Sequence, residues 1–281
     1  MPVVTAKDGA ELHYDIHDYT DPWKNAPTLV LQHGFGRSSR FWYNMVPYIA
    51  RYYRVICPNL RGLGASPVNF DLDRGITVEN YISDLVTIIG QLGEKTVHYA
   101  GESLGGILGF ALAAERPDLI RTLSVFAAPL VISKQTQKTF ALNHPTWQDA
   151  LRILGAAGWS RAVNTATRFP PDTDPGLMEW FNSEVGKNKV EVMIAMSRLA
   201  SKVDAEPFLA RVKAPVLGLY PTDGAITAAD QMAAIRTKIA NLTLIHLPTR
   251  YHMVQTIFPA TCAEHVLHFM SIHDGRAARE G

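Results

Sequence analysis

Cysteine is scarce in this sequence of 281 residues, which contains only two cysteines, Cys57 and Cys262. Two cysteines far apart in the chain do not make a disulfide framework, and a free thiol at the end of an apolar run is usually buried. We therefore expect the protein to work in a reducing compartment, the cytoplasm. The first ten residues lack the apolar stretch of a signal peptide, which agrees with this expectation.

An excess of charge of either sign is also missing. Against 27 lysines and arginines stand 26 aspartates and glutamates, for a formal net charge of +1. No basic or acidic block stands out, so electrostatics gives no reason to expect nucleic acid or an anionic membrane as a partner. No Cys-x-x-Cys pair is present and the ten histidines are scattered, so we expect no metal site and no cofactor.

Long hydrophobic runs are absent too. The longest one, around residues 104–114, is about half as long as a helix that crosses a bilayer. We therefore expect no membrane partner. A small-molecule substrate is the one partner that the sequence indicates, and the oligomeric state stays open.

Apolar residues, by contrast, make up 47% of the chain, enough for the core of one α/β domain with an insertion. Asp8-Gly9 between two alternating runs predicts a β-hairpin. Further short β-rich runs, several of them apolar at every position, predict a parallel sheet covered on both faces. These runs are residues 28–32, 54–57, 96–100, 122–127, 215–220 and 242–247.

Helical patterns alternate with these runs. One begins at the N-cap Thr77 and has apolar residues three and four apart, and another covers residues 104–115. This alternation predicts an α/β fold with a doubly wound, mostly parallel sheet. Residues 130–210 contain no strand-like run, so we expect a helical cap inserted before the last two strands. The core domain would then be residues 1–129 and 211–281, and the cap helices 147–155, 158–167, 176–186 and 189–200.

The stretch Gly101-Glu102-Ser103-Leu104-Gly105 is a G-x-S-x-G pattern placed between a predicted strand and a predicted helix. Glycines on both sides allow the sharp turn that exposes a nucleophilic serine. The start of the following helix favours negative charge that develops beside Ser103. We therefore predict that Ser103 is a nucleophile rather than an ordinary turn residue.

A nucleophilic serine needs a base, and the base needs an orienting acid, in the chain order Ser, Asp or Glu, His. Of the five histidines after the predicted cap, only His252 occupies a loop between a strand and a helix. Asp223 is the only carboxylate in the loop after the strand at 215–220, and the loop one strand earlier has none. The predicted triad is Ser103, Asp223 and His252.

With these motifs the sequence resembles the α/β-hydrolase fold superfamily, in the cap-bearing branch with esterases, lactonases and carbon–carbon bond hydrolases. L-Q-H-G-F-G-R-S-S-R-F-W at residues 31–42 is similar to the oxyanion loop, and C-P-N-L-R-G-L-G-A-S at 57–66 to the turn after the next strand. The resemblance implies an oxyanion hole from the backbone N–H groups of Phe35 and Leu104. A serine at the elbow argues against epoxide hydrolases and haloalkane dehalogenases, which carry Asp there.

The sequence departs from the pattern of this superfamily at three positions. Asn59 stands where Asp is more common, and Tyr251 precedes His252 where glycine is common. The usual spacing of the superfamily would place the acid at Gly224, one residue after Asp223. Asp223 therefore stands one residue before the position that the resemblance implies for the acid.

Substrate choice is expected to lie in the cap and in the wall that faces it. The candidate pocket residues are Trp42, Trp147, Trp159 and Trp180, with Arg37 and Arg250 as candidate partners of a substrate carboxylate. The leading function is hydrolysis of an ester or lactone of a small to medium, largely apolar substrate. An amide, a carbamate or a carbon–carbon bond would be cleaved by the same residues. Alternatives of another class on this fold are a cofactor-free oxygenase and a small-ligand receptor.

Overall fold

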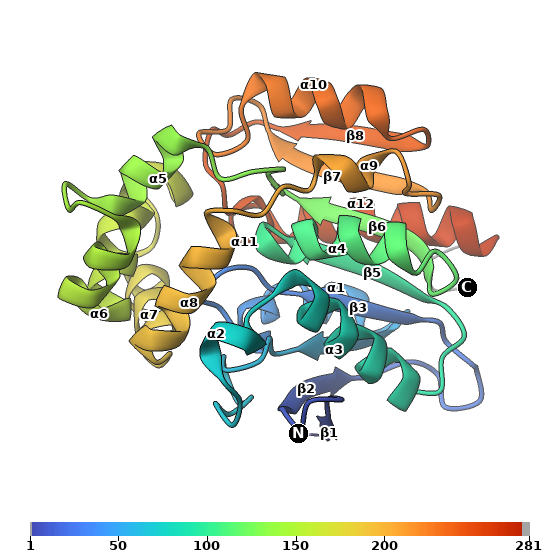
Figure 1. Cartoon of the computed structure of the whole chain (residues 1–281). Helices are drawn as coiled ribbons and strands as arrows, with labels where there is room; N and C mark the ends of the chain where they lie inside the picture. The colour runs from blue at the N-terminus through green and yellow to red at the C-terminus, as the bar shows by residue number, and fades with distance from the viewer. Residues whose placement is uncertain (1, 277–281) are drawn as a thin grey trace.

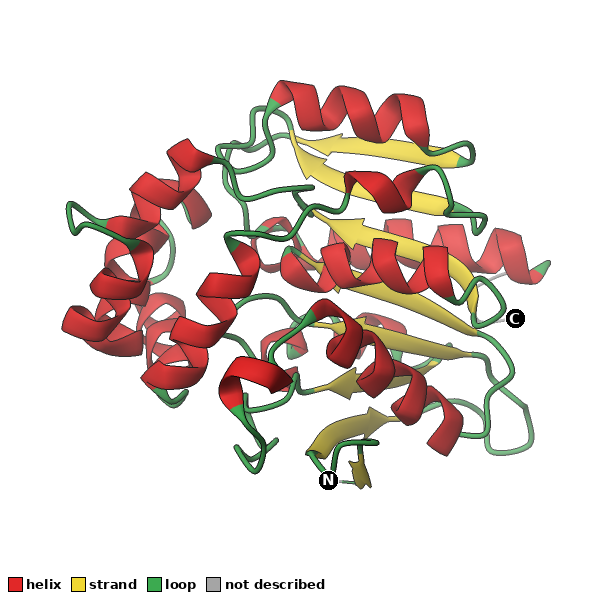
Figure 2. Cartoon of the chain, viewed as in Figure 1, coloured by secondary structure: helices red, strands yellow, loops and turns green. Residues whose placement is uncertain are grey.

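The computed structural model describes residues 2–276. At its centre is one eight-stranded sheet with the order β1-β2-β4-β3-β5-β6-β7-β8 (Figures 1 and 2). The strands are β1 (Val3–Thr5), β2 (Glu11–His17), β3 (Thr28–Gln32), β4 (Arg54–Pro58), β5 (Val97–Glu102), β6 (Ile120–Phe126), β7 (Val216–Pro221) and β8 (Leu242–Leu247). The strands from β3 to β8 are parallel, and β1 and β2 are antiparallel at one edge. The predicted α/β class and the mostly parallel sheet are confirmed.

The predicted hairpin forms between β1 and β2, where Thr5 pairs with Glu11. Gly9 in its turn has a φ of +87°, a conformation that glycine adopts at no steric cost. Each of the other predicted runs coincides with one of the strands from β3 to β8, within a few residues. Buried apolar runs were therefore a sufficient signal for the central strands.

Helices cover both faces of the sheet (Figure 2). In β3, Val30 packs into one hydrophobic core, and Leu29 and Leu31 pack into a second core on the opposite face. The helices that contribute to these cores are α1 (Val46–Ile49), α3 (Val78–Gln91), α4 (Leu104–Glu115), α10 (Ala229–Lys238) and α12 (Pro259–Asp274). The Thr77 hydroxyl caps α3 as predicted, because it accepts the Asn80 N–H at 3.1 Å.

The segment between β6 and β7 is helical, and we refer to residues 130–210 as the cap segment. Its elements are α5 (Lys134–Ala141), α6 (Trp147–Val163), the π-helical turn η2 (Asn164–Arg168), α7 (Pro175–Gly186), α8 (Val190–Ala200) and α9 (Glu206–Leu209). The sequence predicts two separate helices at residues 147–155 and 158–167. The structure instead has the single helix α6, which is kinked at Gly155, whose φ is +67°. Helix α5 was not predicted. Figure 1 shows α5 to α8 beside the ends of β6 and β7 that their arrowheads mark.

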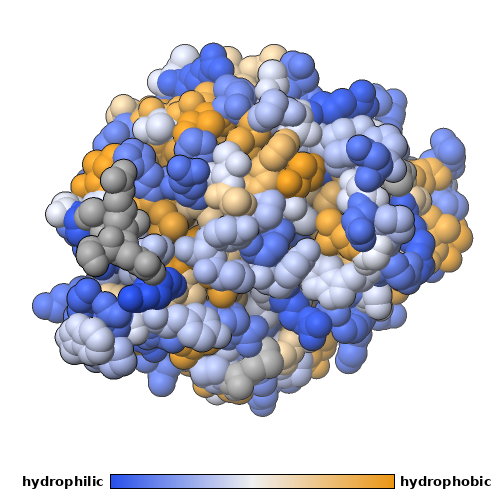
Figure 3. Space-filling model, turned by 180° about the vertical axis from the view of Figure 1, so that it is seen from behind, coloured by the Kyte–Doolittle hydropathy of each residue, from blue (hydrophilic) through white to orange (hydrophobic). Residues whose placement is uncertain are grey.

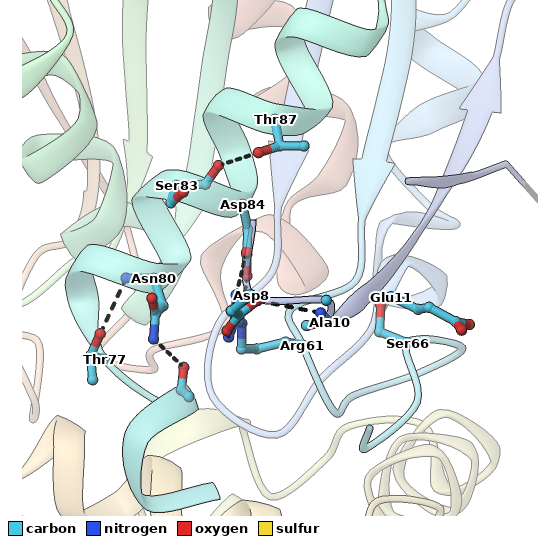
Figure 4. A network of polar contacts seen from close by, with 12 residues as sticks. Asp8, Ala10, Glu11, Arg61, Ser66, Thr77, Asn80, Ser83, Asp84 and Thr87 are labelled. Carbon is cyan, nitrogen blue, oxygen red and sulfur yellow. Dashed lines mark hydrogen bonds and ion pairs between the residues drawn. The ribbon is translucent and has the colours of Figure 1, made fainter. Parts of the chain in front are cut away.

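An ion-pair cluster around the buried Arg61 joins the β1–β2 turn to α3 at the edge of the sheet (Figure 4). Arg61 donates to the Asp84 carboxylate from Nε at 2.7 Å and to the Asp8 carboxylate from Nη1 at 2.6 Å. Both neighbours accept from a planar guanidinium, so the pairing fixes geometry as well as charge. The role of the cluster is structural, since one guanidinium joins carboxylates from two separate elements of the fold.

Within the described residues, no helix combines the length and the apolar character that crossing a membrane would require. The rear face of the molecule mixes hydrophilic and hydrophobic residues (Figure 3).

Three short helical elements complete the fold: η1 (Ser39–Trp42), α2 (Leu72–Gly75) and α11 (Val254–Ile257).

Candidate active site

The chain turns sharply from β5 into α4 at Ser103, whose φ and ψ are 53° and −116°. A Cβ at Gly101 would lie 2.3 Å from the carbonyl oxygen of Gly105, and a Cβ at Gly105 would lie 2.3 Å from that of Gln32. Only glycine fits at both positions without moving backbone atoms. The strained strand-to-helix turn that the sequence predicts is therefore present, and backbone contacts within the turn and with β3 hold it.

Two buried residues offer backbone N–H groups beside Ser103. Neither the Phe35 N–H nor the Leu104 N–H donates a hydrogen bond to any group in the described part of the chain. Both residues line the same small cavity as Ser103. Two unpartnered backbone donors in residues that line the same cavity as the candidate nucleophile are what the predicted oxyanion hole requires.

The loop that carries Phe35 is held in place by Glu102, the residue before Ser103. The Glu102 carboxylate accepts the Gly34 N–H at 3.1 Å and the Arg37 guanidinium at 2.8 Å. Arg37 in turn donates from Nη1 to the carbonyl oxygen of Phe35 at 2.8 Å. This buried ion pair therefore fixes the loop that presents the Phe35 N–H.

A buried histidine supports the same loop from the other side. Nε2 of His33 accepts the Leu60 N–H at 3.1 Å, so the ring carries its proton on Nδ1 and donates to the carbonyl oxygen of Gly34 at 2.9 Å. Burial lowers the pKa of His33 to about 3, which keeps this ring neutral. Its role is structural.

His252 lies on the loop after β8, with its side chain buried. Its Nε2 is 3.5 Å from Oε1 of Glu102. Burial lowers the pKa of His252 well below its ordinary value, and the positive charges of Arg37 and Arg168 lower it further. The imidazole is therefore neutral at neutral pH, the state that a general base requires.

Ser103 and His252 line one closed cavity of about 20 Å³. Of the other predicted site residues, Phe35, Leu104, Arg37 and Trp147 line it too. Trp159 supports this wall, because its ring stacks on Trp147 with the centroids 5.7 Å apart. The structure thus brings together the predicted nucleophile, the predicted base, the predicted oxyanion donors and two of the four tryptophans that the sequence singled out.

The other predicted pocket residues lie elsewhere. Trp42 packs against Phe126 in the core on the opposite face of the sheet, with the ring centroids 5.8 Å apart. Trp180 lies on α7 at the rim of a wide surface hollow that Trp42 also borders. Arg250 is exposed and stacks on the ring of the adjacent Tyr251. These three side chains do not reach the cavity at Ser103.

Asp223 also lies apart from the base. It is exposed on the loop after β7, and in the described residues Glu102 has the only carboxylate within 4.0 Å of the His252 ring. The reason is local, since the Thr222 N–H donates to the carbonyl oxygens of Leu247 and Thr249 at 3.0 and 2.9 Å. These bonds hold the start of the loop against the end of β8. The structure does not bring Asp223 to His252, and its role as the acid stays a prediction.

Two charged residues of the cavity region escaped the sequence analysis. Glu102 stands inside the G-x-S-x-G motif, but the motif leaves its identity open. Arg168 lines the cavity from η2, although nothing in its sequence neighbourhood distinguishes it from an exposed arginine. Both side chains are buried, and only the folded structure reveals this.

Comparison with known proteins agrees with this geometry. A family model described as alpha/beta hydrolase fold matches residues 27–162, which contain the oxyanion loop, the elbow and the first part of the cap segment. Together with the sheet order, this match shows that the chain has the α/β-hydrolase fold. Several of its relatives are named as hydrolases or esterases and others as receptors, and the hydrolase names support an enzyme.

Three similar proteins illustrate the relationship. The chain is 35% identical over 158 residues to a putative carbamate hydrolase RutD of Stutzerimonas stutzeri, a match that spans 56% of each chain. It is 23% identical over 252 residues to the strigolactone esterase D14 of Arabidopsis thaliana, over 84% of this chain and 89% of that relative. The enol-lactonase structure from Burkholderia xenovorans LB400 has a TM-score of 0.83 at 22% identity and shares the fold over 96% of this α/β hydrolase and 99% of that chain.

Proposed function

We propose that this α/β hydrolase cleaves a carboxylic ester or lactone of a small to medium organic substrate through an acyl-enzyme on Ser103. One observation carries the proposal. Ser103 sits in the strained turn at the start of α4 and shares a closed cavity with a neutral, buried His252. The unpartnered N–H groups of Phe35 and Leu104 belong to the same cavity.

The chemistry follows from these groups. The Ser103 hydroxyl attacks the carbonyl carbon while His252 takes its proton, and the oxyanion that forms accepts hydrogen bonds from the Phe35 and Leu104 N–H groups. The protonated imidazole then gives its proton to the departing alcohol, which leaves the acyl group on Ser103. Water attacks this ester with His252 again as the base, and the acid is released. Asp223 is the proposed orienting acid.

The size of the cavity bears on substrate entry. A volume of about 20 Å³ is close to that of one water molecule and smaller than any ester. The cap segment therefore has to move for substrate to reach Ser103, and its return excludes bulk water during the reaction. A cytoplasmic location belongs to the same proposal, supported by two cysteines that are both free and buried.

Labelling by a fluorophosphonate probe tests the proposal, because the probe reacts only with an activated serine. We expect the wild-type protein to be labelled and Ser103→Ala to be unlabelled and inactive on 4-nitrophenyl acetate. Ser83→Ala on α3 is the matched control and keeps both signals. Full activity of Ser103→Ala would remove Ser103 from the mechanism.

Carbamate hydrolysis is the second candidate, favoured by the 35% identity to a relative with that name. The same serine, base and oxyanion hole would act on a carbamate carbonyl. A panel of matched esters, lactones, carbamates and amides separates the two functions. Our proposal requires the highest kcat/KM to fall on an ester or a lactone.

A further inference from the structure

Arg168, the last residue of η2, places a buried guanidinium in the wall of the active-site cavity. The guanidinium carbon lies 5.0 Å from the centre of the Trp159 ring and 5.6 Å from that of Phe140. Its Nη1 donates to Oδ1 of Asn164 at 3.2 Å. Two aromatic faces and an amide thus hold the side chain in one orientation.

The guanidinium of Arg168 lacks an anionic partner. No carboxylate in the described part of the chain lies within 4.0 Å of it, and its Nε is buried without a hydrogen-bond partner there. The nearby carboxylate, Glu102, already accepts from Arg37 at 2.8 Å. One ion pair is therefore complete, and one positive charge is left over.

The charge balance of the cavity confirms this excess. Burial lowers the pKa of Arg168 to about 9, with a further lowering from the charge of Arg37, so the group is still positive at neutral pH. His252 is neutral and adds no compensating charge. A buried, unpaired charge is costly, and a leucine or methionine would fill the space between Trp159 and Phe140 without that cost. An anion that enters with the substrate removes the imbalance.

We propose that Arg168 binds a carboxylate of the substrate, so that the ester or lactone cleaved at Ser103 carries a free carboxylate elsewhere in the same small molecule. The planar fork of a guanidinium matches a carboxylate in two parallel hydrogen bonds. Arg37 does not fill this role, because its charge is already paired with the Glu102 carboxylate at 2.8 Å. The hydrolytic part of this inference rests on the proposed function, whereas anion binding can be measured without it.

Binding to the Ser103→Ala protein tests the anion site apart from catalysis. The probes are the monomethyl esters of succinate, glutarate and adipate, each compared by calorimetry with its neutral dimethyl ester. We expect at least one monoester to bind about tenfold or more tighter than its dimethyl partner, as a charge-assisted bidentate pair would give. Equal binding within all three pairs would overturn the proposal.

Substitution of Arg168 identifies the group responsible. In the Ser103→Ala background, Arg168→Met is expected to abolish the preference for the monoester and Arg168→Lys to keep part of it. Arg161→Met is the matched control, since Arg161 is exposed on α6 and pairs with Glu179. A preference that survives in Arg168→Met refutes the assignment. Inorganic phosphate that binds as tightly as the preferred monoester would also refute it.

Kinetics then links the anion site to the reaction. The wild-type protein is expected to hydrolyse mono-4-nitrophenyl glutarate with a higher kcat/KM than 4-nitrophenyl valerate, which has nearly the same length and no charge. Arg168→Met lowers this ratio at least about tenfold. If neither ester is hydrolysed, the proposed function fails while the calorimetry still decides the anion site. If both are hydrolysed at equal kcat/KM, only the role of Arg168 fails.

Discussion

The backbone N–H of His252 donates to the carbonyl oxygen of Thr167 at 3.0 Å, and this bond ties the candidate base to the cap segment. The next residue repeats the contact, since the Met253 N–H donates to the carbonyl oxygen of Arg168 at 3.2 Å. Both acceptors belong to η2, a π-helical turn of the kind often found at functional sites. The position of the imidazole therefore depends on the same turn that carries Arg168.

A second contact joins the cap segment to the oxyanion loop. The Asn188 side chain donates to the carbonyl oxygen of Gly36 at 2.8 Å, and a Cβ at Gly36 would lie 2.6 Å from the end of the Met193 side chain. The cap segment thus contacts both the loop of the oxyanion donor and the loop of the base. We therefore expect that cap movement in the proposed mechanism would also release these two loops and so couple substrate entry to the assembly of the site.

Replacement of Asp223 by Asn tests the proposed acid. Asp223 follows β7 and precedes His252, the chain order that this fold requires, although in the structure the two side chains are apart. Hydrolysis by this triad therefore requires residues 222–228 to move toward the imidazole. We expect Asp223→Asn to lower kcat on 4-nitrophenyl butyrate by roughly three to four orders of magnitude, because the wrong imidazole tautomer is then favoured.

Asp230→Asn is the control for this substitution, because Asp230 is exposed in the first turn of α10. It is expected to keep kcat within about threefold of wild type, the scatter of an uninvolved surface site. A similarly small effect of Asp223→Asn would contradict its role and leave Glu102, the carboxylate beside His252, as the group to test next.

The stability of the protein is expected to fall as the pH drops below about 6.5, the ordinary pKa of histidine. His252 and His33 have lowered pKa values in the folded state because both are buried. Below pH 6.5 the unfolded chain therefore binds more protons at these two residues than the folded chain does. Each group then removes up to about 1.4 kcal/mol from the free energy of unfolding per pH unit.

Urea unfolding between pH 7.5 and pH 5 measures this slope, in a range where most carboxylates are still ionised. His252→Gln removes one of the two contributions and is expected to make the slope shallower. His246→Gln, a substitution of an exposed histidine on β8, is expected to leave it unchanged. A free energy of unfolding that stays constant down to pH 5 would show that neither ring is held neutral by burial.

The residues that the sequence predicted well are those whose conformation is fixed locally. At the elbow, Gly101 faces the backbone of Gly105 and Gly106 in the same turn, whereas Gly105 faces the backbone of Gln32 in β3, so the glycines of the motif mark both close approaches. The central strands can be predicted from the sequence equally well, because burial on both faces requires an apolar residue at nearly every position. Helix α5 was missed because it is short and mostly polar, with few apolar residues to mark a buried face.

The residues that the sequence could not place depend on contacts across the fold. Arg168 becomes a cavity residue only because Trp159 and Phe140 enclose it, and no local pattern marks that arrangement. Tryptophans at helical spacing show that a surface is buried without showing which one. Trp42, which the sequence analysis assigned to the wall that faces the cap, belongs to the core on the other face of the sheet.

The contrast between Trp159 and Trp180 provides a test of which cap residues select the substrate. Trp159 is buried beneath Arg168 and stacks on Trp147, which lines the cavity. Trp180 is partly exposed and packs against Phe41 and Tyr43, with ring centroids 5.2 and 4.8 Å away. We therefore expect substitution of Trp159, and not of Trp180, to change the ranking of acyl chain lengths.

Trp159→Phe is the variant to use first, because Trp159→Ala would cost about 3–5 kcal/mol of stability through the cavity it leaves. The measurement is kcat/KM on 4-nitrophenyl acetate, butyrate and octanoate, with Trp180→Phe as the matched control. Trp159→Phe enlarges the space behind Trp147, so the longer acyl chains gain relative to acetate, whereas Trp180→Phe keeps the wild-type order. A changed order in Trp180→Phe alone would mean that acyl chains extend into the surface hollow beside Trp42 rather than into the closed cavity.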